Sequence, residues 1–80
     1  MAIGNGLSSI SNDKLKRIVE RHQHFLNSDC KNWQDMQAFF LHTSFEDMDL
    51  SGLNLSGAIF SHTSFNRAKM KNINLHGATF

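Results

Sequence analysis

From residue 40 to residue 80, a large apolar residue stands at every fifth position of the chain. A small or apolar residue precedes each by two positions, and the residues between them are mostly Ser, Asn, Asp, Gly, Lys or His. A helix face repeats about every 3.6 residues and a strand face every two, so neither explains a period of five. The pattern predicts short extended steps separated by corners and stacked coil upon coil. The nine large apolar centres are Phe40, Phe45, Leu50, Leu55, Phe60, Phe65, Met70, Leu75 and Phe80.

A longer repeat of twenty residues contains four of these steps. Residues 41–60 and 61–80 align with nine identical positions, including the word HTSF at 42–45 and again at 62–65. We therefore expect the coil to close every twenty residues, with side chains twenty positions apart stacked on each other. The core residues expected to be buried are Phe45, Leu50, Leu55, Phe60, Phe65 and Leu75.

Three units show the sequence of the step most clearly: MDLSG (48–52), LNLSG (53–57) and INLHG (73–77). They resemble the A(D/N)Lxx consensus of the pentapeptide repeat family. The resemblance covers residues 38–80 and implies a mainly β fold, a right-handed, four-sided β-helix with four units per coil and about two coils.

Residues 12–27 show helical spacing instead. Ser11 or Asn12 can cap the start of this helix. Its apolar face would be Leu15, Ile18, Val19, His22, Phe25 and Leu26. We expect this helix and a lead-in loop, together residues 12–37, to cap the exposed end of the first coil; a partner-binding arm is the alternative. Residues 1–11 are expected to be a flexible N-terminus.

The composition indicates the cellular compartment in which the protein is expected to fold. The formal net charge is +1, and no apolar run is long enough for a membrane span. The N-terminus lacks the basic start and long apolar core of a signal peptide. The single cysteine, Cys30, excludes a disulfide within the chain and is typical of a reducing compartment. We expect a cytoplasmic protein without a membrane partner.

No catalytic residues, metal site or cofactor is expected. Cys30 has no histidine or acid in a recognisable sequence arrangement, and the chain has no glycine-rich phosphate loop. His22 and His24 are two apart on a helix and point in different directions. His42 and His62 should stack one coil apart, but two ligands without a third are weak evidence for zinc.

Charge is the one distinctive feature of the repeats. The first full coil carries three acidic residues and the second carries three basic residues at nearby register positions. The set is Glu46, Asp47, Asp49, Arg67, Lys69 and Lys71. Asp47 should lie beneath Arg67, and Asp49 beneath Lys69. The charges either form a solvated ladder of ion pairs or contribute to a partner-binding surface.

The last coil would leave its outer apolar face without cover. That face comprises Met70, Leu75, Ala78 and Phe80. We expect a homodimer through this coil, a mode that the family resemblance also implies. The alternative is that the chain is the front of a longer protein.

Without catalytic chemistry, the protein is expected to act through its surface. The leading hypothesis is a small inhibitor or docking protein, possibly encoded by a phage or mobile element, that acts on a bacterial host protein. Nucleic-acid machinery, such as a topoisomerase or a CRISPR effector, is the target class to test first. The family's gyrase inhibitors mimic DNA with a long acidic rod, which this short, nearly neutral chain is not. The alternatives are a structural module of a larger protein and weak direct nucleic-acid binding through Lys14, Lys16, Arg17 and Arg21; nucleic acid is the less favoured partner.

Overall fold

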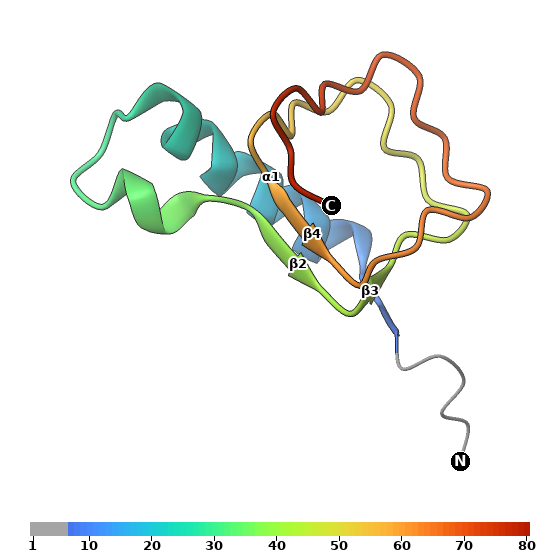
Figure 1. Ribbon diagram of the computed structural model, residues 1–80. Helices are drawn as coiled ribbons and strands as arrows, with labels where there is room; N and C mark the ends of the chain where they lie inside the picture. Colours follow the sequence, from blue (N-terminus) through green and yellow to red (C-terminus); the bar gives the residue numbers. More distant parts are fainter. Residues whose placement is uncertain (1–6) are drawn as a thin grey trace.

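The computed structural model describes residues 7–80. One short strand, an α-helix and a 3-10 helix precede a region of short strands and turns (Figure 1). The elements are β1 (Ser8–Ser9), α1 (Asn12–Asn27), a 3-10 helix (Trp33–Met36), β2 (Phe39–Leu41), β3 (Thr43–Ser44) and β4 (Ile59–Ser61). Within this part of the chain, no helix has the length and apolar character needed to cross a membrane.

Helix α1 begins and ends where the sequence predicts. The Ser11 hydroxyl accepts a hydrogen bond from the Lys14 N–H (3.1 Å) and so caps the first turn. Ser28 ends the helix in the left-handed conformation, with φ of 50°. The apolar face packs against the coils, with Leu15 and His22 buried.

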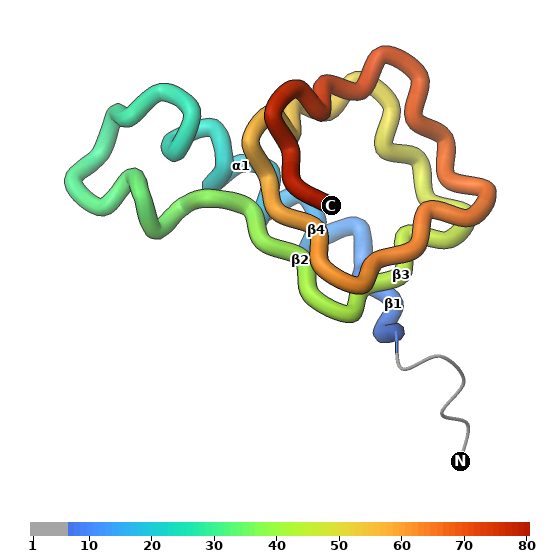
Figure 2. The backbone as a smooth tube through the Cα atoms, in the orientation of Figure 1, coloured from blue at the N-terminus to red at the C-terminus, as the bar shows by residue number. Residues whose placement is uncertain are grey.

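The repeat region winds through two turns of backbone that lie one on the other (Figure 2). Strand β2 pairs with β4 in parallel, so that Phe40 lies beside Phe60. Single bridges continue the same pairing around the coil: Ser44 with Ser64, Asp49 with Lys69, Asn54 with Asn74 and Ile59 with Thr79. Every one of these partners is twenty residues away, which confirms the predicted register.

The corners of the coil recur every fifth residue and have positive φ. The eight corner residues are His42, Asp47, Gly52, Gly57, His62, Arg67, Asn72 and Gly77. Left-handed backbone costs an ordinary residue about 1–2 kcal/mol, whereas glycine adopts it freely and Asn or Asp tolerate it. This requirement explains why Gly, Asn and Asp recur between the apolar centres.

Local hydrogen bonds close the corners at Asp47, Gly52, Gly57, Arg67, Asn72 and Gly77. The Leu53 N–H, for example, donates to the Leu50 carbonyl (3.3 Å), and the Asn54 side-chain oxygen accepts from the Ser56 N–H (3.2 Å). A turn therefore satisfies its own polar groups without a long strand. The strands stay short because a corner interrupts them every five residues.

The core is a ladder of apolar centres. The buried apolar residues are Leu15, Ala38, Phe40, Phe45, Leu50, Leu55, Ala58 and Phe60. Burial was predicted correctly for four of the six expected core residues. For Phe65 and Leu75 it was wrong: both are only half-buried and pack against the core from outside. They belong to the second coil, and within residues 7–80 no further coil covers them.

Helix α1 and the lead-in segment cap the first coil. The His22 ring donates to the Ser56 carbonyl (2.7 Å), and the Gln23 amide donates to the Asn54 carbonyl (3.3 Å). The Gln37 amide donates to the Gly57 carbonyl (2.8 Å). These side chains satisfy acceptors along the edge of the coil that no neighbouring coil reaches. These bonds hold the helix and the lead-in segment against the first coil, as expected of a cap.

The expectation of a flexible segment at 1–11 is wrong for its second half. Strand β1 pairs in parallel with β3, and the Ser8 N–H donates to the His42 carbonyl (2.8 Å). The edge of the first coil offers unpaired backbone groups at this point, and an extended segment satisfies them. Residues 1–6 of the predicted segment lie outside the described residues.

Candidate interaction surface

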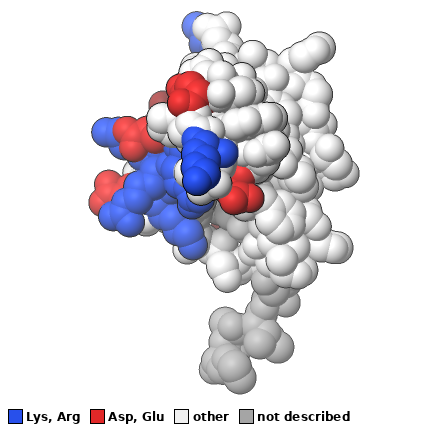
Figure 3. All heavy atoms as spheres, turned by 90° about the vertical axis from the view of Figure 1, so that its left-hand side faces the viewer, with Lys and Arg blue, Asp and Glu red and all other residues white. Residues whose placement is uncertain are grey.

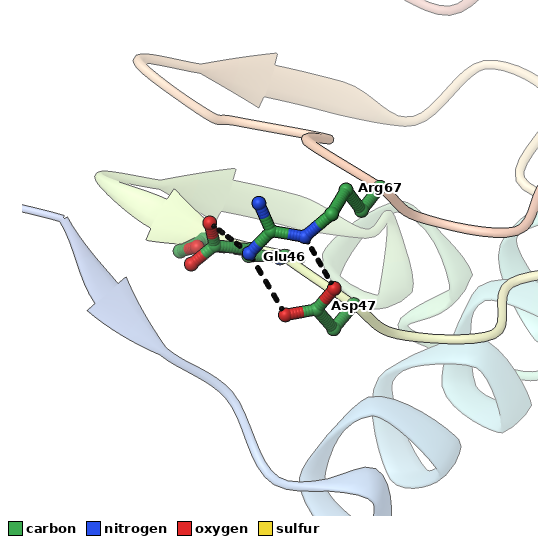
Figure 4. Close-up of polar contacts among 4 residues, drawn as sticks. Glu46, Asp47 and Arg67 are labelled. Carbon is green, nitrogen blue, oxygen red and sulfur yellow. Dashed lines mark hydrogen bonds and ion pairs between the residues drawn. The ribbon is translucent and has the colours of Figure 1, made fainter.

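Arg67 connects the two coils at the centre of the charged surface predicted from the sequence. Its Nε donates to Asp47 Oδ1 (2.7 Å), and its Nη2 donates to Asp47 Oδ2 (3.1 Å) and to Glu46 Oε2 (2.8 Å) (Figure 4). Asp47 and Arg67 occupy equivalent corners of successive coils. The backbone itself therefore places the two side chains one above the other, and the predicted pairing of Asp47 with Arg67 is confirmed.

This ion pair changes how the partners titrate. The hydrogen bond from the Arg67 guanidinium holds the pKa of the Asp47 carboxyl below its usual range. The hydrogen bond to Asp47, with the negative charges of Asp47 and Glu46, raises the pKa of Arg67 in turn. All three side chains are largely exposed. Water screens such pairs, so the cluster contributes little to stability despite its good geometry.

Asp49 lies beside Lys69 as the register predicts, but their side chains form no ion pair in residues 7–80. The Asp49 carboxylate instead accepts a hydrogen bond from the Ser51 N–H (3.0 Å). This bond lowers the pKa of Asp49, with a smaller contribution from the charge of Lys69. The Asp49 carboxylate is thus bonded to the backbone of its own turn. Lys69 and Lys71 are exposed cations on the second coil.

The sequence did not single out the exposed apolar residues of β2. Phe39 is 56% exposed and Leu41 is 50% exposed, although both flank the buried Phe40. They line a cavity of about 340 Å³ between β2, β1 and the start of α1, together with Lys14 and Ile18. The available signal was the run FFL, which puts large apolar residues at two outward positions of a unit.

The match to known families is decisive for the repeat region. The model for pentapeptide repeats matches residues 37–80 in eight copies, which is more than half of the chain. The chain belongs to the pentapeptide repeat family. No match was found among the curated proteins or among the solved structures.

The outer face of the second pentapeptide coil is apolar. Phe80 is 70% exposed; its ring stacks on Phe60 at 5.1 Å between centroids and meets Phe65 edge-on at 6.1 Å. Met70, Leu75 and Ala78, the other members of the expected dimer face, are half-buried. This face of the second coil therefore combines one exposed aromatic ring with three half-buried apolar side chains.

Charged side chains collect on another part of the surface. Figure 3 shows basic side chains, with acidic ones among them, on one half of the face it presents. Helix α1 contributes four exposed basic residues, Lys14, Lys16, Arg17 and Arg21. Arg21 already donates to Met36 Sδ (3.3 Å) and to the Asp35 carbonyl (3.5 Å). The mixture of signs is unlike the uniform basic surface typical of nucleic-acid-binding proteins.

The histidines of this pentapeptide repeat protein fall into distinct environments. His42 and His62 stack as predicted, with ring centroids 4.9 Å apart. His22 is fully buried, and its two ring nitrogens bond to the Ser56 carbonyl and the Ala38 N–H. His24 lies at the end of α1 and bonds to Asp29 (2.7 Å).

Proposed function

We propose that this chain is a non-catalytic protein-binding module built on a right-handed, four-sided β-helix of about two coils. The observation that supports it best is the exposed pair Phe39 and Leu41 beside the 340 Å³ cavity. Large apolar side chains that border a pocket commonly anchor a protein partner, and charged residues around them add orientation and association rate. Lys14 lines the same cavity, and the exposed charged residues of the two coils add to the electrostatic field that steers association.

The proposed activity is inhibition or docking at a bacterial host protein in the cytoplasm, with nucleic-acid machinery as the first class to test. Purified gyrase and a CRISPR effector nuclease can each be assayed with and without the protein. Loss of DNA supercoiling by gyrase, or of DNA cleavage by the nuclease, at one equivalent of this protein per enzyme would support the proposal. Unchanged activity of both enzymes would contradict this target class and leave a structural module as the better hypothesis.

Two double substitutions on the surface test the apolar anchors and the charged residues separately. Phe39→Ser with Leu41→Ser should abolish capture of the partner, because it removes the exposed apolar anchors without touching buried Phe40. Arg67→Glu with Lys69→Glu should keep the fold, lower stability only slightly because solvent screens the exposed ion pairs, and slow association. Pull-down from bacterial lysate and biolayer interferometry on the captured partner measure these effects, with circular dichroism as the folding control. Undiminished capture by the Phe39/Leu41 variant would contradict the proposed anchor.

We further propose that the outer face of the second coil binds a second copy of the chain. A twofold partner presents the same apolar face, so one surface covers Phe80 in both subunits. Phe80→Asp should then convert the dimer to a monomer, because it brings two carboxylates together near the twofold axis. Multi-angle light scattering of both proteins at tens of micromolar measures the effect. A monomeric unmodified chain would contradict the dimer and favour the alternative in which further repeats of a longer protein cover this face.

A further inference from the structure

Three metal-ligating side chains meet where α1 ends. His24 stands in the last turn of the helix, and Asp29 and Cys30 follow Ser28, the residue that caps its C-terminal end. Ser28 has φ of 50°, so the chain reverses there and brings the next two residues back beside the last turn. His24 Nδ1 lies 2.7 Å from Asp29 Oδ1, and one donor atom from each of the three residues falls within 4.8 Å of the others.

We propose that His24, Asp29 and Cys30 form a binding site for a transition-metal dication of the Zn²⁺ type. Donors to one zinc ion lie about 2.0–2.3 Å from it, so two donors on the same ion are at most about 4.6 Å apart. The three side chains are already close to that limit. His24 is 52% exposed and Asp29 is 45% exposed, so small rotations that complete the geometry meet little resistance from packing.

The donor types select the metal. One imidazole nitrogen, one carboxylate oxygen and one thiolate sulfur suit zinc or cobalt, whereas calcium and magnesium prefer oxygen ligands alone. A fourth position remains for water. The carbonyls at the C-terminus of a helix also carry partial negative charge, which favours a cation at this end of α1.

Binding is balanced by proton release. The Cys30 Sγ–H bond breaks, the sulfur–metal bond forms with the sulfur electron pair, and the proton passes to solvent. His24 binds through an unprotonated ring nitrogen. Binding through Nδ1 replaces the hydrogen bond with Asp29 by a bond to the metal, whereas binding through Nε2 leaves Nδ1 to keep it. No residue changes its oxidation state.

The other histidines provide a contrast. Both ring nitrogens of His22 are bonded within the protein, so it has no lone pair free for a metal. His42 and His62 stack face to face without belonging to a three-donor group in the described residues. The sequence favoured no metal site because His22 and His24 diverge on the helix. That reasoning holds for this pair, but it did not anticipate the left-handed corner at Ser28.

The full chain, reduced and freed of metal, should be titrated with Co²⁺ under anaerobic conditions. We expect a thiolate-to-cobalt charge-transfer band in the near ultraviolet that saturates at one ion per chain, together with the visible bands of a tetrahedral site. Zn²⁺ should bleach both. Cys30→Ser should remove the charge-transfer band, and His24→Gln and Asp29→Asn should each weaken binding at least about tenfold. His62→Gln, an exposed histidine outside the cluster, should bind as the unmodified chain does.

Two results would overturn the site. The first is the absence of a saturable band with the unmodified chain. The second is binding by His24→Gln and Asp29→Asn with unchanged affinity, which would reduce the cluster to an isolated cysteine. A ¹H–¹⁵N spectrum with and without Zn²⁺ provides an independent readout, because signals of residues 24–30 should shift while those of the second coil stay in place. The three ligands are exposed or half-buried, so their substitution should leave the fold intact. The same spectrum checks that each variant is folded.

Discussion

Phe60→Ala should reduce the free energy of unfolding by about 3–5 kcal/mol, the usual cost of removing a buried phenylalanine ring. Phe60 is 1% exposed and connects both coils. Its ring stacks between Phe40 and Phe80, each at 5.1 Å, and meets Phe45 and Phe65 edge-on. Small domains have a total stability of only about 5–15 kcal/mol. We therefore expect a large loss of melting temperature, or an unfolded protein at room temperature.

Urea and thermal unfolding measure this effect, and two phenylalanine variants calibrate it. Phe39→Ala should change stability by less than about 1 kcal/mol, because the ring is mostly in solvent. Phe65→Ala should fall between the two, since Phe65 is half-buried and stacks on Phe45 at 5.1 Å. Equal losses for Phe60→Ala and Phe39→Ala would contradict the assignment of inward and outward positions.

The order of these three effects reflects what the sequence could predict. The five-residue period predicted which side chains point inward, and the twenty-residue period predicted the stacked partners. Both are properties of a repeated backbone conformation, so a single sequence displays them directly. The bounds of α1 were predictable for a different reason: helical spacing and the Ser11 cap are signals carried by neighbouring residues.

Burial within each coil was not predictable from the period alone. Phe45 and Phe65 occupy equivalent positions in identical HTSF words, yet one is buried and the other is half-buried. The difference comes from what lies above and below each coil, which is a tertiary property. The pairing of β1 with β3 was missed for a related reason, because two short polar residues carry little strand propensity of their own.

The charged surface shows a similar division. The register placed Asp47 beneath Arg67, and the bidentate geometry followed from two equivalent corners. The same register placed Asp49 beside Lys69, but a local competitor, the Ser51 N–H, took the carboxylate. Asp and Asn side chains commonly bond to the backbone two residues later. Register therefore predicts proximity, and local hydrogen bonding decides whether proximity becomes an ion pair.

His22→Ala should have the second large effect, a loss of about 3 kcal/mol or more. The buried ring joins the helix to the first coil: Nε2–H donates to the Ser56 carbonyl, and Nδ1 accepts from the Ala38 N–H. Leaving a buried donor or acceptor without a hydrogen-bond partner costs about 1–3 kcal/mol for each group. The removed ring also leaves a void beside Phe25, whose ring stacks on His22 at 5.3 Å. Denaturant unfolding should show the loss, whereas His76→Ala, at an exposed histidine, should leave stability within about 0.5 kcal/mol.

A second substitution separates hydrogen bonding from volume. His22→Phe keeps an aromatic ring in the site but offers neither a donor nor an acceptor. It should still cost about 2 kcal/mol, because the Ala38 N–H and the Ser56 carbonyl lose their partner. Amide exchange at Ala38 should accelerate in this variant, since that N–H would be the group left without an acceptor. A His22→Phe protein as stable as the original, with Ala38 still protected, would mean that packing alone holds the cap. Helix α1 would then bind the coil as an apolar lid, and the two hydrogen bonds of His22 would contribute nothing to its attachment.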